Sequence, residues 1–130
     1  MKRGLQRASL LIGLFGLILL AACSSHPDKE KEVESTPVKI QIDITKNQGA
    51  EQLATKKIKA DQGMSLYTIM KENFDIEDEE GFITSIDGVS QNASAGEYWL
   101  FEINGEMSTK GAKDVQPKDG DQISWDLHGN

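Results

Sequence analysis

The sequence predicts an α+β fold in which a single helix packs on one face of a mixed β-sheet. Residues 38–45 and 122–127 alternate apolar and polar side chains, which is the period of a strand with one buried face. Residues 66–74 instead place apolar side chains at three- and four-residue spacings, as an amphipathic helix does. About ninety residues follow position 37, which is enough for one small core and too few for two.

The first strand is expected to form a hairpin with a weaker second strand. Its buried face would carry Val38, Ile40, Ile42 and Ile44. Asn47, Gln48 and Gly49 follow as a turn. Residues 53–60, which include three lysines, would form the second strand.

A helix is expected over residues 66–73. Ser65 precedes it and can cap it by accepting a hydrogen bond from a free backbone N–H. The face turned to the core would carry Leu66, Ile69, Met70 and Phe74. Residues 75–80 carry five acidic side chains without the glycine and late glutamate of a calcium loop, so a solvated loop is predicted there.

Three further strands complete the predicted sheet. Residues 82–86 form one and end at an Asp87-Gly88 turn, and residues 89–96 read as a polar loop. Residues 97–103 are rich in aromatic and β-favouring side chains and run into Asn104-Gly105, a strong hairpin signal. After an irregular stretch with at most one helical turn and a turn at 117–120, residues 122–127 form the closing strand. This order of elements is typical of a β-grasp-like fold.

The N-terminal residues have the order of a secretory signal peptide. Three basic residues precede an apolar run over residues 8–20, and the run ends in Leu20-Ala21-Ala22-Cys23. This tetrapeptide resembles the lipobox of bacterial lipoproteins, which implies cleavage after residue 22 and lipidation of the Cys23 thiol. The alternative is an uncleaved membrane anchor, for which the apolar run falls short of the about 20 residues that a helical span needs.

Three segments are therefore predicted: a signal peptide (1–22), a lipidated cysteine with a flexible tether (23–37), and a folded domain (38–130). The tether is polar and charged, so it cannot bury enough surface to fold. Loss of residues 1–22 lowers the number of basic residues from 14 to 11 against 21 acidic ones, and the net charge changes from −7 to −10. An acidic surface disfavours nucleic acid and anionic lipid head groups as partners, so attachment to the membrane would depend on acyl chains at Cys23.

Little in the sequence points to catalysis. Cys23 takes the lipid, so the folded domain has no thiol, and its one histidine is His128, near a terminus where chains usually fray. Without a second histidine or a cysteine, a zinc site or a nucleophile–base pair is hard to build. We expect no catalytic residues, no metal site and no required cofactor, although composition leaves a pair of carboxylates open.

The aromatic strand is the best candidate for a functional surface. Side chains alternate along a strand, so Trp99, Phe101 and Ile103 would share one face, and Tyr98, Leu100 and Glu102 the other. One face must meet the helix, and the other would present Tyr98 and Leu100 to a ligand or a partner. The alternative is that both aromatic rings lie in the core.

Several short motifs together resemble the transcobalamin-like C-terminal domain family of bacterial surface proteins and lipoproteins. They are residues 81–88 (GFITSIDG), 98–101 (YWLF), Asn104-Gly105, 110–112 (KGA) and 117–123 (PKDGDQI). The resemblance implies a non-catalytic domain similar to the β domain of transcobalamin and intrinsic factor, which hold cobalamin between that domain and a helical domain that this chain lacks. Carried over by motif, the ligand side would include Tyr98, Trp99, Leu100, Glu102 and Asn104.

Two functions follow from these observations, with a third kept open. The first is a lipid-anchored binding module on the outer face of the cytoplasmic membrane, in a Gram-positive cell, that takes cobalamin, another corrinoid or another small ligand and hands it to a membrane importer. The second is a cell-surface protein–protein interaction or structural module with no small ligand. The third is an enzyme such as a cell-wall hydrolase, which the scarcity of histidine and cysteine disfavours.

Overall fold

The computed structural model describes residues 36–129. The predicted signal peptide, the lipidation site and nearly all of the predicted tether lie outside these residues. Along the described chain the elements follow in this order: β1 (Val38–Lys46), β2 (Glu51–Ala60), α1 (Leu66–Asn73), β3 (Ile76–Glu79), β4 (Phe82–Ile86), β5 (Val89–Ser90), the 3-10 helix η1 (Ala93–Ala95), β6 (Tyr98–Ile103), β7 (Glu106–Met107), the 3-10 helix η2 (Ala112–Asp114) and β8 (Gln122–His128).

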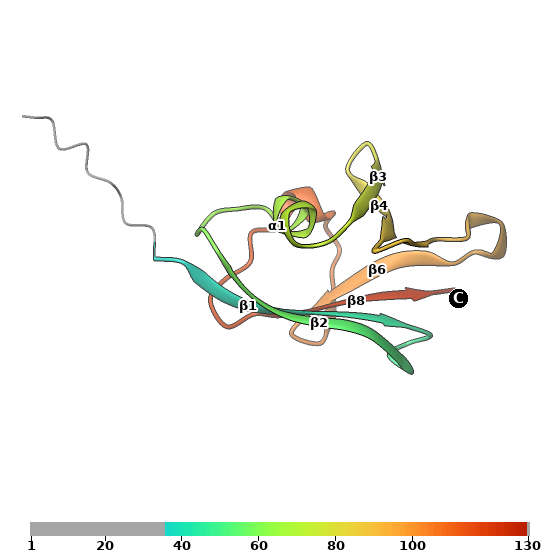
Figure 1. Ribbon diagram of the computed structural model, residues 1–130, viewed down its shortest axis with the longest axis horizontal. Coiled ribbons are helices and arrows are strands. Elements are labelled where there is room, and N and C mark those ends of the chain that lie inside the picture. Colours follow the sequence, from blue (N-terminus) through green and yellow to red (C-terminus); the bar gives the residue numbers. More distant parts are fainter. Residues whose placement is uncertain (1–35, 130) are drawn as a thin grey trace, which may run out of the picture. The chain divides into compact units, whose positions relative to one another are not determined.

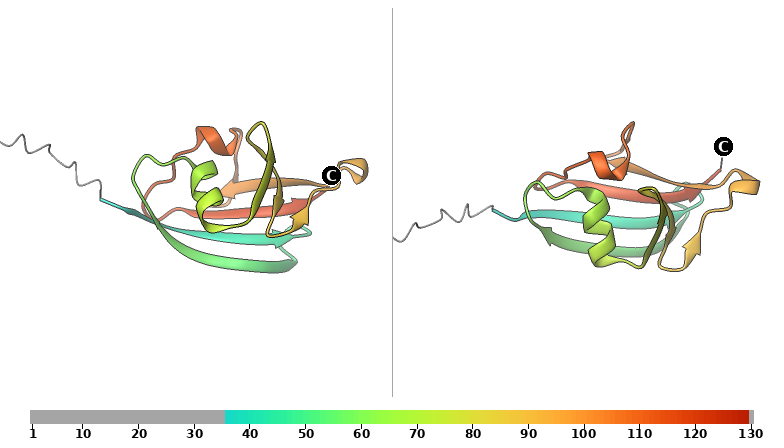
Figure 2. Two further views of the ribbon diagram at one scale, coloured as in Figure 1. Left: turned by 45° about the horizontal axis from the view of Figure 1, so that its top comes forward. Right: turned by 90° about the horizontal axis from the view of Figure 1, so that it is seen from above.

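The main sheet has five strands in the order β2-β1-β8-β6-β7. The first and last strands, β1 and β8, run parallel at its centre, and the other neighbours are antiparallel. α1 lies across one face of this sheet (Figures 1 and 2). The predicted mixed sheet with one helix on one face is therefore confirmed, as are the β1–β2 hairpin and the Asn104-Gly105 hairpin that joins β6 to β7.

The helix begins where the sequence indicated. The side chain of Ser65 accepts a hydrogen bond from the Thr68 backbone N–H at 3.2 Å, which caps the first turn. At the other end the Lys56 ammonium donates to the Asn73 carbonyl and lies 4.4 Å from the centre of the Phe74 ring. A cation at this end also complements the helix dipole, so both ends of α1 are satisfied.

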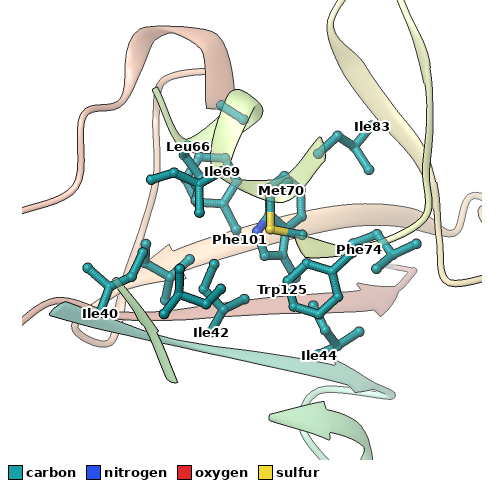
Figure 3. Packing of buried hydrophobic residues seen from close by; sticks show 14 of the residues in the cluster. Ile40, Ile42, Ile44, Leu66, Ile69, Met70, Phe74, Ile83, Phe101 and Trp125 are labelled. Carbon is teal, nitrogen blue, oxygen red and sulfur yellow. The ribbon is translucent and has the colours of Figure 1, made fainter. Parts of the chain in front are cut away.

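The core fills the space between α1 and the sheet. Its completely buried side chains come from α1, from the central strands β1 and β8, and, as Ile86, from β4. Figure 3 shows Leu66, Ile69 and Met70 of the helix above Ile42 and Ile44 of the sheet. The predicted alternation holds along β8, where Ile123, Trp125 and Leu127 are buried. All four apolar residues assigned to the core face of the helix are buried.

A second, smaller sheet with the order β3-β4-β5 corrects three expectations. The predicted strand at residues 82–86 is present as β4, but it belongs to this smaller sheet and not to the main one. Residues 75–80 are not a solvated loop, because Ile76–Glu79 form β3 and pair with β4. Side chains alternate along β3: Ile76 and Asp78 are half-buried, while Glu77 and Glu79 point to solvent. An acidic segment can therefore form a strand without burying most of its charges. Residues 89–96 likewise hold the short strand β5 and η1 rather than only a loop.

Candidate ligand-binding site

A cavity of about 880 Å³ lies between β6 and the β3–β4 hairpin. Figures 1 and 2 show this hairpin and α1 side by side over the same face of the main sheet. The cavity has an aromatic floor, a β4 wall and a loop wall. The residues of these surfaces are Trp99, Phe101 and Trp125 for the floor, Phe82, Ile83 and Thr84 for the β4 wall, and residues 108–112 for the loop wall.

The floor is a rigid aromatic surface. The rings of Phe101 and Trp125 have centroids 4.6 Å apart and are tilted by 35°. The indole N–H of Trp99 donates to the Val89 carbonyl at 2.9 Å, which fixes that ring against β5. All three floor residues are buried, so their rings are already held in place before any ligand arrives.

The β4 wall is held in place by polar contacts between the hairpin and α1. The Tyr67 hydroxyl donates to Asp78 Oδ1 at 3.0 Å, and Lys71 Nζ lies 3.5 Å from the same oxygen. Asp78 Oδ2 accepts from the Gly81 backbone N–H at 2.9 Å. The Gly81 N–H, with smaller effects of Tyr67 and Lys71, lowers the pKa of the Asp78 carboxyl against the opposing effect of burial. The carboxylate therefore stays ionised and joins the hairpin to the helix.

Gly81 faces the side chain of Lys113, a residue of η2. Its φ of +90° suits glycine, and a Cβ there would contact the end of the Lys113 side chain. The Lys113 side chain runs past this point, and its ammonium lies 4.9 Å from the centre of the Tyr67 ring. A side chain at position 81 would meet only the flexible end of Lys113, which can move aside, so the positive φ is the main reason that glycine stands here.

One side of the cavity is an open strand edge. β6 pairs with β8 along its whole length but with β7 only at Glu102 and Ile103. The Phe101 carbonyl also accepts a hydrogen bond from the Ser108 N–H at 3.0 Å on the β7 side. Residues 98–100 thus have a neighbouring strand on one side only, and the cavity lies along their free edge. At the mouth, Phe82 is 72% exposed, and the carboxylates of Glu79 and Glu80 stand with Lys110 around the opening.

The structure brings three of the five predicted site residues to this cavity. Trp99 forms part of the floor. Tyr98 and Leu100 border the cavity at the open edge of β6, although their side chains belong to the other face of the sheet. The predicted alternation of faces is confirmed, since Trp99 is buried while Tyr98 is 44% and Leu100 38% exposed. Their role in binding stays a prediction.

The other two predicted site residues lie elsewhere. Glu102 lines a smaller cavity, described below. Asn104 sits in the β6–β7 turn, where its side chain donates to Asp121 Oδ1 and accepts from the Gln122 N–H, each at 2.9 Å. Their assignment as ligand contacts also stays a prediction. The sequence did not indicate Phe82 or Trp125 as cavity residues. The alternating pattern of β8 did indicate that Trp125 is buried, but it gave no sign that the residue borders a cavity.

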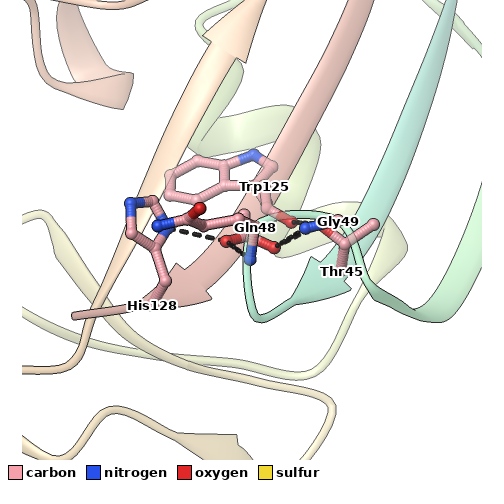
Figure 4. A network of polar contacts seen from close by, with 6 residues as sticks. Thr45, Gln48, Gly49, Trp125 and His128 are labelled. Carbon is pink, nitrogen blue, oxygen red and sulfur yellow. Dashed lines mark hydrogen bonds and ion pairs between the residues drawn. The ribbon is translucent and has the colours of Figure 1, made fainter. Parts of the chain in front are cut away.

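The smaller cavity, of about 310 Å³, lies on the opposite face of the main sheet. Beside it, Asp126 accepts hydrogen bonds from the Thr45 hydroxyl (2.6 Å), the backbone N–H groups of Gln48 (2.9 Å) and Gly49 (3.0 Å), and lies 2.6 Å from His128 Nδ1 (Figure 4). Burial would raise the pKa of the Asp126 carboxyl, but the hydrogen bonds from Thr45, Gly49 and Gln48 outweigh it, so the pKa is lowered.

This cluster corrects the expectation that the chain frays at His128. The residue belongs to β8, and its ring is held by Asp126 because the β1–β2 turn folds over the end of that strand. The carboxylate oxygens of Asp126 thus already accept hydrogen bonds from other parts of the fold and are not free to bind a ligand. The larger, aromatic cavity is therefore the better candidate site.

The part of the chain that the structure describes offers neither a metal cluster nor a membrane-spanning helix. Within residues 36–129, no group of three or more His, Cys, Asp or Glu side chains is placed to hold a metal ion. Over the same part of the chain, no helix has the length and apolar character to cross a membrane.

The fold and the cavity define a small α+β domain with one aromatic-floored cleft beside an open strand edge. The chain belongs to the DUF4430 family, a domain of unknown function, whose sequence profile matches residues 63–129. This stretch contains α1 and every residue of the larger cavity. The family description names no catalytic activity. A comparison with curated protein sequences found no match.

Solved structures of other proteins share the fold. Haptocorrin in complex with Cbi superposes with a TM-score of 0.61 at 16% identity, covering 73% of this chain and 26% of haptocorrin. A protein from Ruminococcus gnavus ATCC 29149, described as a candidate metal-binding protein, gives a TM-score of 0.54 at 20% identity, covering 72% of this chain and 98% of that one. The predicted likeness to transcobalamin-like domains is thereby confirmed for the fold. This chain spans about a quarter of the haptocorrin chain.

Proposed function

We propose that this protein is a non-catalytic, lipid-anchored binding module that takes a corrinoid in the cavity between β6 and the β3–β4 hairpin. The observation that carries the proposal is the aromatic floor of that cavity in a fold shared with haptocorrin, a protein solved in complex with Cbi. Binding of a corrinoid needs no catalytic group, and the cavity offers an apolar surface that such a ligand can contact.

The shape and chemistry of the cavity suit a large, flat ligand. Its volume of about 880 Å³ lies within the range of small-molecule sites, roughly 300–1,000 Å³. Aromatic faces gain dispersion energy against a flat macrocycle, and rings that are already fixed lose little entropy when the ligand binds. The open edge at residues 98–100 leaves room for a ligand that extends beyond the floor. In this arrangement Trp99 lies under the ligand, and Tyr98 and Leu100 flank it.

Calorimetry with cobinamide tests the proposal on the full chain in detergent solution. We expect saturable heat with one site, and a loss of affinity of about tenfold in Phe82→Ala, since an exposed aromatic ring at the mouth contributes contact but little stability. Leu53→Ala is the matched control, because Leu53 is an exposed apolar residue on β2 that does not line the cavity. Absence of heat together with unchanged tryptophan fluorescence at high cobinamide concentration would remove the corrinoid function.

The location proposed for this module is the outer face of the cytoplasmic membrane, with acyl chains on Cys23 as the anchor and a membrane importer as the recipient. The support is the Leu20-Ala21-Ala22-Cys23 motif after an apolar run. Because the chain has one cysteine, labelling of cells with radioactive palmitate reports on that residue alone. We expect label in the unchanged chain and in Ser24→Ala, and none in Cys23→Ala. Label that persists in Cys23→Ala, or a mature mass that still includes residues 1–22, would contradict the anchor.

A protein-interaction function is favoured by a different observation. Tyr98, Leu100 and Met107 are exposed apolar side chains on neighbouring strands β6 and β7. Grouped apolar side chains of this kind are typical of protein contact surfaces. This function remains if cobinamide gives no heat.

A further inference from the structure

The outer strand β2 leaves one edge of the main sheet open. β2 is the first strand in the sheet order, so among residues 36–129 it pairs with β1 and with no other strand. Figures 1 and 2 show it along the margin of the sheet. With ten residues it is also the longest strand of the described chain. Its free edge is therefore longer than the open stretch of β6 beside the cavity.

The hydrogen bonds of β1 decide which groups of β2 point to this edge. The N–H of Gln41 donates to the Asp121 carbonyl on the β8 side. Because backbone groups alternate along a strand, odd-numbered residues of β1 bond toward β8 and even-numbered ones toward β2. Even-numbered residues also stand opposite each other in the two strands, as Ile40 does opposite Ile58. The odd-numbered residues of β2 therefore direct their N–H and C=O groups into the open edge, and these are Thr55, Lys57 and Lys59.

β2 is also a basic strand in an acidic protein. The chain has 14 basic residues against 21 acidic ones, yet residues 52–60 hold three lysines and no acidic residue. Lys57 and Lys59 are exposed, and within the described residues neither forms an ion pair. Lys39 of β1 stands directly opposite Lys59 on the same face. Like charges in this arrangement repel each other, so an anion beside them would be stabilising.

Two carboxylates near these lysines are already hydrogen-bonded within the fold. Asp43 accepts from the Thr55 hydroxyl at 2.8 Å, and Asp119 accepts from the Lys39 backbone N–H at 2.8 Å. Neither forms an ion pair with Lys57 or Lys59. The open edge therefore combines unused backbone groups with positive charge.

We propose that the β2 edge binds an extended segment of another protein that carries acidic side chains at every second position. The backbone groups of Thr55, Lys57 and Lys59 pair with this segment as an added strand, a mode in which main-chain hydrogen bonds supply affinity and alternate side chains supply specificity. The acidic side chains then stand beside Lys57 and Lys59 as cross-strand neighbours. No residue of β2 lines the ligand cavity, so this surface is separate from the proposed corrinoid site.

The same lysines disfavour a second copy of this chain on the edge. Two β2 strands that paired with each other would bring Lys57 and Lys59 of both copies together on one face of the joined sheet. Lysines on edge strands commonly prevent such pairing. An acidic segment is attracted by the charge that repels a second copy, and this attraction should weaken as salt is added.

A peptide titration into the full chain in detergent solution tests the inference. The probe is a short synthetic peptide in which glutamate alternates with threonine, and hydrogen exchange of each backbone amide is followed in ¹⁵N spectra. We expect the amides of Thr55, Lys57 and Lys59 to exchange about tenfold more slowly when the peptide is bound. The amide of Ile58, which faces β1, should keep its rate.

Matched probes and variants separate the backbone contribution from the charges. A peptide with lysine in place of glutamate, and a glutamate peptide with a methylated backbone, should both fail to protect the amides. By calorimetry, the double variant Lys57→Gln with Lys59→Gln should raise the dissociation constant of the glutamate peptide about tenfold. Lys113→Gln, which removes an exposed lysine of η2, should leave it unchanged.

The outcomes that would overturn the inference are equally specific. Equal binding of the glutamate peptide and either control peptide would do so, as would unchanged exchange at high concentrations of the glutamate peptide. A chain that is dimeric without peptide, with the amides of Thr55, Lys57 and Lys59 already protected, would place a second copy on the edge and also overturn it. Protection that the double variant loses and Lys113→Gln keeps would support it.

Discussion

Replacing Ile123 with alanine should lower the free energy of unfolding by about 2–5 kcal/mol. Ile123 is completely buried on β8, the strand that lies between β1 and β6, and it stands opposite Ile42 on one side and Ile103 on the other. Loss of its side chain leaves a cavity that neighbours on both flanking strands cannot fill. Small domains have only about 5–15 kcal/mol of stability in total, so a visible fraction of the chain should unfold.

Urea denaturation followed by tryptophan fluorescence measures this loss, because both tryptophans are buried in the folded state. Leu53→Ala is the matched control, since Leu53 is 38% exposed on the outer strand β2 and its truncation should change stability by no more than about 0.5 kcal/mol. Similar losses in the two variants would mean that β8 is not the centre of the packed sheet.

Replacing Asp126 with asparagine should lower stability at neutral pH by about 2 kcal/mol, the range of hydrogen bonds to a charged group. The carboxylate accepts from Thr45, Gln48 and Gly49. An amide offers these donors one oxygen in place of two and leaves at least one of them unpaired. Thr45→Val removes a single one of these hydrogen bonds and should give an intermediate loss.

The pH dependence of the same variant follows from the direction of the shift. The pKa of Asp126 is lowered in the folded state from its ordinary value of 3.8. The stability that this carboxylate contributes is therefore fully present above about pH 4 to 5 and is lost as the pH falls through the lowered folded-state pKa. Thermal melts from pH 6 downward should show a steeper acid loss in the unchanged chain than in Asp126→Asn. Parallel acid profiles would show that the carboxylate network does not stabilise the fold.

Most of the main sheet could be predicted from the sequence because its strands are long and face one core. β1 and β8 alternate apolar and polar residues over their length, and Ser65 with the spacing from Leu66 to Phe74 defined α1. β3 could not be predicted, because its acidic side chains are those of a loop and only pairing with β4 makes it a strand. β5 and β7 have two residues each, too few to show a period.

The candidate site could be predicted only along one strand. Tyr98, Trp99 and Leu100 are consecutive and aromatic or apolar, so they stood out in the sequence. The remaining cavity residues come from β4, from the 108–112 loop and from β8, and the fold alone brings these segments together. Trp125 illustrates the limit: alternation marks it as buried, but whether its N–H is paired depends on neighbours that no sequence pattern specifies.

The parallel pairing of β1 with β8 has a consequence for how the chain is made. Gln41 stands opposite Gln122, so the centre of the sheet joins the two ends of the domain. Contacts between residues so far apart in sequence form slowly, since a long loop must close first. While the chain is being synthesised, β1 has only β2 beside it, and the main sheet lacks its middle strand until β8 emerges. We therefore expect the core of this domain to close only after residues 122–128 have been made.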